Sequence, residues 1–337
     1  MPLNAQSDGC PSSVGVIDVV VCQASVEMST RVPIDGIRTG DIDVAHKDAS
    51  GVTFLHLACR QGDAELVSEL CSLGAPLNAL TVQHRSPLHE AIDSPECVRI
   101  LLARGADVES FKHGDWTPLM TAATRGRLDV VDQLLDAGAN VAHANRDGWN
   151  SLHLACREGH LSVVERLVSV SPETVHVSTR NGTTALTTAA LHGHVDIVRL
   201  LLKCGASPTA ADFSGCTPLM KAALGGHCKV LELLLSTLSS DDVTAVDGGG
   251  RSAAHYAAQG GSADCLIAIA NNPAGHALLT LPDATSKWTP AHCAARDGRL
   301  PIIHALRSLG VPLDTPDKRG HIPTEIGAHQ QKAASVC

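Results

Sequence analysis

The sequence predicts an all-α solenoid of about eight helix-turn-helix repeats joined by short turns, with a truncated C-terminal cap. A similar block recurs about every 33 residues, as at residues 116–120 and 216–220. Each block leads into an apolar run such as residues 130–135, which ends in a Gly-Ala pair such as Gly138-Ala139. The 337 residues include only three Phe, one Tyr and three Trp, so small aliphatic side chains must fill the core.

Each repeat is expected to begin at the first residue of a tight turn, usually Asp or another polar residue. The predicted starting residues are Asp48, Thr81, Lys112, Asn145, Thr179, Asp212, Asp247 and Asp283. A truncated ninth repeat begins at Asp317 and is expected to close the C-terminal end.

Within a repeat, the Asp-x-x-Gly pattern predicts the turn, because Gly tolerates a positive φ. The Thr-Pro pair, as at residues 117–118, predicts a helix start, since Thr caps and Pro needs no amide partner in the first turn. Gly-His, as at residues 159–160, separates the two helices. The spacing of Val163, Val164 and Leu167 follows one face of the second helix.

Two repeats depart from this pattern. The repeat from Thr81 lacks Gly-His, and residues 93–95 lead directly into its second helix, so we expect a shorter turn between its helices. The repeat from Asp247 has Ala254 where the six preceding repeats carry Leu, and Asn-Asn-Pro at residues 271–273. Weaker packing is expected in that repeat.

The repeats define the expected domain organisation. Residues 40–330 form the repeat array, residues 1–39 an N-terminal tail with a degenerate cap, and residues 331–337 a C-terminal tail. Pro33 and Gly36 interrupt the segment before the array, so its helices cannot be recognised from the sequence.

Charge and composition argue against several classes of partner. The formal net charge is -9, from 26 basic and 35 acidic residues, and no run of Lys or Arg appears, which disfavours direct nucleic-acid binding. The apolar residues 14–22 contain Asp18 and follow no basic residue, so they do not resemble a signal peptide. No stretch is long enough to span a membrane. We expect no membrane association and a monomer.

The cysteines and histidines belong to the repeat. None of the twelve Cys forms a Cys-x-x-Cys pair, and Cys59 and Cys156 occupy a small buried slot. They are interpreted as core thiols of a cytoplasmic protein, with the nucleus as a second compartment. Five of the eighteen His share the slot after Leu and are expected to hydrogen-bond between adjacent turns: His56, His89, His153, His255 and His292.

No pattern of metal ligands, phosphate-binding glycines or activated nucleophile is present. The sequence therefore predicts no metal, no cofactor and no enzymatic activity.

One slot of the repeat varies more than packing would allow. The position after the turn glycine reads Val52, Arg85, Trp116, Trp149, Thr183, Cys216, Arg251 and Trp288. No shared packing role fits both Arg and Trp, so we expect this slot at the foot of the turn, on the concave side of the solenoid. It holds all three Trp of the chain, and aromatic residues are enriched at binding hot spots.

The predicted partner-binding patch combines this slot with the turns between helices. Trp116 and Trp149 stand in adjacent repeats, and Arg125, Arg157 and His192 are expected on the same side. The alternative interpretation is that each Trp lies over the neighbouring turn and only stiffens the stack.

These features together resemble the ankyrin repeat, over about residues 40–330. A closer resemblance covers residues 110–120, 145–153, 157–159 and 189–194. Those segments look like the ankyrin repeat domain-containing protein 16 family.

That closer resemblance implies association with alanyl-tRNA synthetase and a role as a co-regulator against serine mischarging. It implies capture of the misactivated seryl group by lysine amines on the ankyrin surface. The corresponding positions here are His113, Arg146 and His176, none of them Lys, and the neighbouring Lys112 is the one candidate acyl acceptor.

Two functions follow as hypotheses. The first is a non-catalytic scaffold or adaptor that binds a protein partner through the concave ankyrin surface. The second is a translation-fidelity cofactor of alanyl-tRNA synthetase. The placement of lysines favours the first.

Overall fold

The computed structural model describes residues 32–327 and divides into two compact units, each described by itself. The first unit ends at Pro118 and also includes Asp136–Ala139. The second comprises Leu119–Leu135 and the chain from Asn140 onward. The expected tail at residues 331–337, and residues 1–31 of the expected N-terminal tail and cap, lie outside the described residues.

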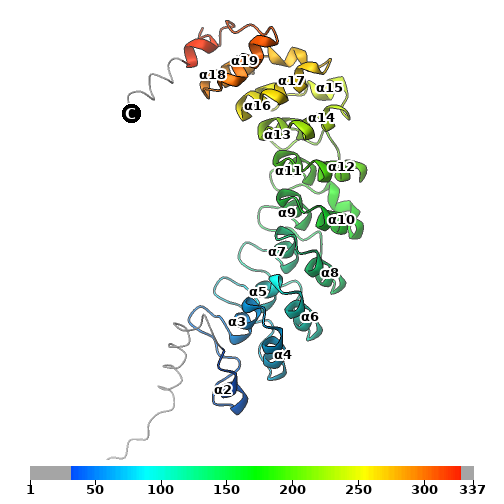
Figure 1. Ribbon diagram of the computed structural model, residues 1–337, viewed down its shortest axis with the longest axis vertical. Helices are drawn as coiled ribbons and strands as arrows, with labels where there is room; N and C mark the ends of the chain where they lie inside the picture. The colour runs from blue at the N-terminus through cyan, green and yellow to red at the C-terminus, as the bar shows by residue number, and fades with distance from the viewer. Residues whose placement is uncertain (1–31, 328–337) are drawn as a thin grey trace, which may run out of the picture. The chain divides into compact units, whose positions relative to one another are not determined.

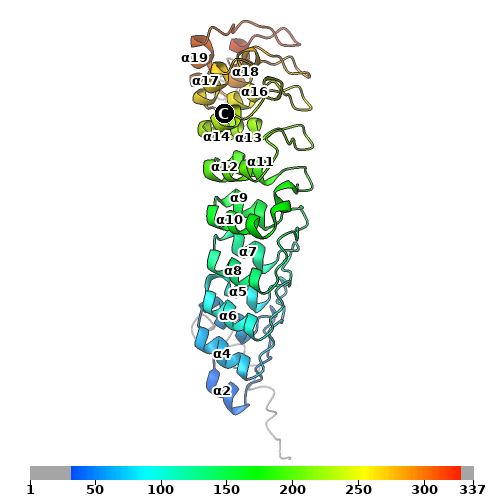
Figure 2. The same cartoon turned by 90° about the vertical axis from the view of Figure 1, so that its right-hand side faces the viewer.

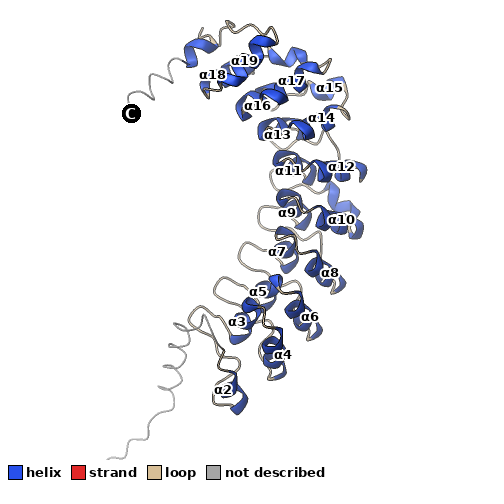
Figure 3. Ribbon diagram, in the orientation of Figure 1, coloured by secondary structure: helices blue, strands red, loops and turns tan. Residues whose placement is uncertain are grey.

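The described residues are helical, as predicted (Figure 3). The first unit contains α2 (Ile34–Thr39), α3 (Phe54–Gln61), α4 (Ala64–Ser72), α5 (Pro87–Glu90), η1 (Ala91–Asp93) and α6 (Pro95–Ala103). Between residues 32 and 327 the only β-type pairings are isolated bridges that close turns, such as Lys47 with Thr53.

The second unit holds the remaining repeats, one helix pair in each. Its first pair is α7 (Pro118–Thr124) and α8 (Leu128–Asp136), whose outermost residues Pro118 and Asp136 belong to the first unit. The next helices are α9 (Ser151–Glu158), α10 (Leu161–Val170), η2 (Pro172–His176), α11 (Ala185–His192), α12 (Val195–Lys203), α13 (Pro218–Gly225) and α14 (Cys228–Leu235). The last are α15 (Ser240–Val243), α16 (Ala253–Gly260), α17 (Ala263–Asn271), η3 (His276–Leu279), α18 (Pro290–Arg296) and α19 (Leu300–Ser308).

The helices of the second unit form two layers (Figure 1). One layer contains the first helix of each repeat, in the order α9, α11, α13, α16 and α18, each packed against the next. The other contains the second helices, in the order α10, α12, α14, α17 and α19. The turns between these repeats project from the same side of the helices (Figure 2). Each repeat therefore adds one turn and one first helix to a continuous surface of the second unit.

The predicted repeat starts are the first residues of the turns. In each turn a backbone N–H of the starting residue donates to the carbonyl that closes the turn, as from Asp48 to Val52 at 3.0 Å and from Asp247 to Arg251 at 2.9 Å. The same bond closes the turns that begin at Thr81, Lys112, Asn145, Thr179, Asp212, Asp283 and Asp317. The assignment of eight repeats and a truncated ninth is confirmed.

The histidine after the Leu slot links neighbouring repeats, as predicted. Its Nδ1 lies within hydrogen-bond distance of the helix-capping residue, for example 2.8 Å from Thr53 Oγ1 for His56. In four of the five histidines Nε2 donates to a carbonyl oxygen of the next turn, as from His56 to Arg85 at 2.9 Å and from His255 to Trp288 at 2.9 Å. His153 is the exception, because its buried Nε2 makes no hydrogen bond within the described residues. One imidazole therefore caps its own helix and ties its repeat to the next turn.

The departures from the pattern have local causes. In the repeat from Thr81, α5 ends at Glu90 and η1 leads to Ser94, which caps α6, so the turn between the helices is short, as expected. Ahead of the array, α2 forms despite Gly36. A Cβ on Gly36 would lie 2.7 Å from the Ile42 side chain, so glycine allows Ile42 to pack there, and the sequence pattern concealed this helix.

Candidate partner-binding surface

The slot after the turn glycine has a rigid backbone. In the turn of Trp149, Asn145 Oδ1 accepts from the Trp149 amide at 2.9 Å, and the Trp149 carbonyl accepts from the Asn145 amide at 2.8 Å. Asp247 holds Arg251 through the same two bonds, at 2.8 and 2.9 Å. Because the backbone is already ordered, a side chain in this slot has less entropy to lose when it contacts a partner.

Trp149 is half-buried at the N-terminal end of α9. Its ring meets His153 edge-on, with the ring centroids 5.9 Å apart and an interplanar angle of 66°. The indole therefore packs in part on the first helix of its own repeat. Arg157 is exposed near the other end of α9.

Arg157 and His192 are brought together by His194. The His194 Nε2 donates to the Arg157 carbonyl at 3.0 Å, and the His192 and His194 rings stack with centroids 6.4 Å apart. Partial burial, followed by the charge of Arg157, lowers the pKa of His192. His192 is therefore mostly neutral at pH 7. Arg157 is the cation beside it, and its Nε lies 3.5 Å from the Glu158 carboxylate.

The predicted patch divides between the two units. Trp116 lies in the first unit, half-buried, with the Lys112 Nζ 4.9 Å from its ring centroid. Arg125 is exposed and lies in the second unit with Trp149, Arg157 and His192. Arg157 and His192 are neighbours through His194. Trp116 belongs to the other unit.

A buried polar cluster at the foot of the turns was not predicted. The Tyr256 hydroxyl donates to Asp247 Oδ2 at 2.7 Å and lies 3.0 Å from Cys216 Sγ. The Arg251 guanidinium contacts Asp247 Oδ2 at 2.9 Å and lies 5.1 Å from the centroid of the Tyr256 ring. Burial opposes ionisation of Asp247, but the hydrogen bonds from Tyr256 and from backbone amides outweigh it and lower its pKa.

Two other repeats form an ion pair with the residue that corresponds to Tyr256 in the first helix. Lys221 Nζ lies 2.9 Å from Asp212 Oδ2 in the second unit. In the first unit, Glu90 accepts from Arg85 at 2.6 Å and from Arg60 at 3.2 Å. The signal in the sequence is the position two residues after the Leu slot, which reads Leu57, Glu90, Thr121, Leu154, Thr188, Lys221, Tyr256 and Cys293. This position varies as much as the slot after the turn glycine.

Three buried thiols are poorly suited to nucleophilic chemistry. Burial raises the pKa of Cys156 and Cys59 far above the usual range, and it raises that of Cys293 to about 11. A thiol in that state carries almost no thiolate at neutral pH. Within residues 32–327, no three His, Cys, Asp or Glu side chains come together as a metal ion would require.

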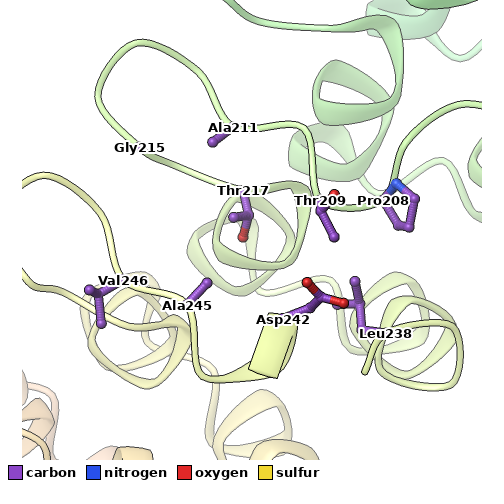
Figure 4. Close-up of a pocket in the computed structure, with 9 residues that line it drawn as sticks. All are labelled: Pro208, Thr209, Ala211, Gly215, Thr217, Leu238, Asp242, Ala245 and Val246. Carbon is purple, nitrogen blue, oxygen red and sulfur yellow. The ribbon is translucent and has the colours of Figure 1, made fainter. Parts of the chain in front are cut away.

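The hollow beside the turn of Asp212 is small and weakly charged (Figure 4). It measures about 250 Å³, and Pro208, Thr209, Thr217 and Leu238 are among its lining residues. Its ionisable residue, Asp242, already accepts from the Ser239 amide and hydroxyl to cap α15. This hollow offers small apolar and hydroxyl groups and no arrangement of catalytic residues.

Comparison with known proteins identifies the family. A family model described as "Ankyrin repeats (3 copies)" matches residues 35–112, 109–178 and 170–247. None of the helices described between residues 32 and 327 is long and apolar enough to cross a membrane.

Relatives share the repeat region over part of their length. The B-cell lymphoma 3 protein homolog of Mus musculus is 36% identical over 119 residues, which is 34% of this chain and 27% of that protein. The tyrosine-protein kinase HTK16 of Hydra vulgaris is 37% identical over 97 residues, 28% of this chain and 13% of the kinase. The SH3 and multiple ankyrin repeat domains protein 2 of Homo sapiens is 28% identical over 93 residues, 27% of this chain and 5% of that protein.

These similarities are confined to a minor part of each relative, so they support a shared repeat and not a shared whole-protein activity. The family model, by contrast, covers more than half of this chain. Together with the turns and helix pairs described above, it shows that the chain belongs to the ankyrin-repeat family.

Proposed function

We propose that this chain is a non-catalytic scaffold or adaptor that binds a protein partner through its turns and first helices. Stacked repeats are used in this way because they present an extended surface and enclose no single pocket. The observation that carries the proposal is the slot after the turn glycine. Its backbone is fixed by the turn, while its side chains vary from Val and Thr to Arg and Trp.

The residues proposed to contact the partner are Trp116, Arg125, Trp149, Arg157 and His192. A half-buried indole with its backbone locked offers a large contact area at a low entropic cost. Arg157 adds a cation near the C-terminal end of α9, and His192 adds a neutral imidazole at the C-terminal end of the adjacent α11. These groups suit a protein surface that carries both apolar side chains and carboxylates.

Site-specific photo-crosslinking tests this proposal. A photoreactive side chain at Thr183 would sit in the variable slot, half-buried. One at the exposed Glu165 of α10 would sit on the second-helix layer and serves as the matched control. We expect protein adducts from Thr183, identified by mass spectrometry, and few from Glu165. Adducts from Glu165 alone would place the binding surface on the second helices and refute the proposal.

A reducing compartment, cytoplasmic or nuclear, is part of the same proposal. All nine cysteines within the described part of the chain are free thiols, which suits a compartment where disulfides do not persist. The partner's identity is left to the crosslinking experiment, because ankyrin surfaces recognise shape and individual side chains.

A further inference from the structure

The last complete turn of the array is one residue longer than the others. The bond that closes it runs from the Asp283 amide to the Trp288 carbonyl, five residues on, whereas the turn from Asp247 closes on Arg251, four residues on. Lys287 has a φ of 58° in the place where Gly250 precedes Arg251. A left-handed Lys costs about 1 kcal/mol relative to glycine, so this turn retains a strained, exposed cation at its tip.

Next to this turn lies an open cavity of about 610 Å³. Its lining includes Thr285, Ser286, Trp288, Lys318, Arg319 and His321. The volume falls within the range of small-ligand sites. The turn from Asp317 forms one side of the cavity and is joined to the other turn by a bond of 2.9 Å from the Lys318 amide to the Ser286 carbonyl.

Trp288 forms a fixed wall of this cavity. Its indole N–H donates to Asp317 Oδ2 at 3.1 Å, and its ring stacks on His292 with centroids 6.3 Å apart. The Arg296 guanidinium lies 5.5 Å from the ring centroid. The ring is thus held by a hydrogen bond, a stacked imidazole and a cation before any ligand arrives.

The charge at the cavity is unbalanced toward positive. Asp317 is 4% exposed and accepts from the Arg319 and His321 amides at 2.7 and 2.9 Å, so its carboxylate is engaged within its own turn. The buried Asp283 likewise accepts from the Ser286 amide at 2.7 Å. Lys318 and Arg319 are exposed and make no ion pair with any residue between 32 and 327.

We propose that this cavity binds an acidic peptide segment of the partner protein. The carboxylates of the peptide pair with Lys318 and Arg319, the hydroxyls of Thr285 and Ser286 add donors, and an apolar side chain rests on Trp288. Charge complementarity argues for this occupant, because two exposed cations beside an aromatic wall attract carboxylates more than neutral groups. The inference rests on the proposed binding function and adds a second site with its own chemistry.

Peptide titration of the full chain tests it. The probes are a fluorescein-labelled peptide of alternating Glu and Leu, its counterpart with every Glu replaced by Gln, and a counterpart with phosphoserine for Glu. We expect the Glu peptide to bind and the Gln peptide to bind about tenfold more weakly. Binding of the Glu peptide should also weaken as salt is raised, since these charges are exposed.

The decisive variant is the double reversal Lys318→Glu with Arg319→Glu. Its matched control is Arg199→Glu with Lys203→Glu, which changes the net charge equally on the exposed face of α12. We expect the first variant to lose at least about tenfold in affinity for the Glu peptide and the control to lose far less. Trp288→Phe, a milder change than removal of the ring, should also weaken binding.

Three results would overturn the inference: equal losses in both charge reversals, equal binding of the Glu and Gln peptides, or binding of the phosphoserine peptide alone. None of these results would contradict the proposed function, which is tested separately by photo-crosslinking from Thr183. If crosslinks form at Thr183 while the Glu peptide fails to bind, the cavity assignment fails alone.

Discussion

Tyr256 and Asp247 meet in a buried hydrogen bond, with the Tyr256 hydroxyl 2.7 Å from Asp247 Oδ2. The Asp247 side chain is 2% exposed, and the same residue begins the turn that holds Arg251. The bond therefore connects the first helix of this repeat to its turn. Ala254, which stands where the six preceding repeats carry Leu, is fully buried in the same helix.

Removal of this hydroxyl should destabilise the second unit. In Tyr256→Phe the Asp247 carboxylate stays buried but loses a donor, which costs roughly 1 to 3 kcal/mol. Urea unfolding at pH 7 measures the change in the free energy of unfolding. Ser214→Ala, at an exposed hydroxyl, should change stability little. Equal stability of Tyr256→Phe and the native chain would show that the cluster contributes nothing.

The sequence could predict the repeats because each turn and helix start depends on local chemistry. Asp48 closes its turn on Val52, and Thr53 caps the helix that follows it, as the pattern required. It could not predict the Tyr256–Asp247 cluster, since this depends on side-chain packing between a helix and a turn nine residues apart. Arg157 and His192 are likewise neighbours only through His194 in the next repeat.

Acid should destabilise the protein through its buried histidines. Burial lowers the pKa of His89 and His153 to about 4, below the value near 6.5 expected when the chain is unfolded. Between these values the unfolded chain binds protons that the folded chain does not. The free energy of unfolding is therefore unaffected by these histidines above pH 6.5. It decreases as the pH falls toward 4, by up to about 3 kcal/mol for each histidine.

The measurement is the free energy of unfolding from pH 7 to pH 4. In His153→Gln the dependence on pH should become shallower, and in Ser214→Ala, at an exposed hydroxyl, it should stay the same. A slope that His153→Gln leaves unchanged would contradict the assignment.

Gly148 should be irreplaceable because two costs coincide there. Its φ is 83°, and a Cβ would lie 2.5 Å from the Arg180 amide nitrogen of the next turn. Gly205 has a φ of 88° but its nearest neighbour for a Cβ is 3.9 Å away. We expect Gly205→Ala to cost about 1 kcal/mol from backbone strain alone and Gly148→Ala to cost clearly more. Equal decreases in melting temperature for the two variants would mean that the adjoining turn can move aside without cost.

Stable acyl transfer to this chain is not expected when a synthetase misactivates serine. The resemblance to the ankyrin repeat domain-containing protein 16 family would place the acceptor lysines at His113, Arg146 and His176, none of which is Lys. The neighbouring Lys112 lies 4.9 Å from the Trp116 ring, a contact that attracts the ammonium form and disfavours the free amine that attack requires. Intact mass and peptide mapping after incubation with alanyl-tRNA synthetase, ATP and serine check this. A seryl adduct that disappears in Lys112→Arg would favour the fidelity hypothesis.

The central claim is that a partner binds through the variable slot at the foot of the turns, and the affinity of Trp149→Ala for the crosslinked partner tests it most directly. We predict a loss of about 2 kcal/mol, or about thirtyfold in Kd, with little change in the melting temperature. Trp116→Ala should lose a similar amount. Val170→Ala, at an exposed apolar residue that ends α10, should bind as the native chain does. Unchanged affinity together with a large loss of stability in Trp149→Ala would contradict the account and show that the indole is structural.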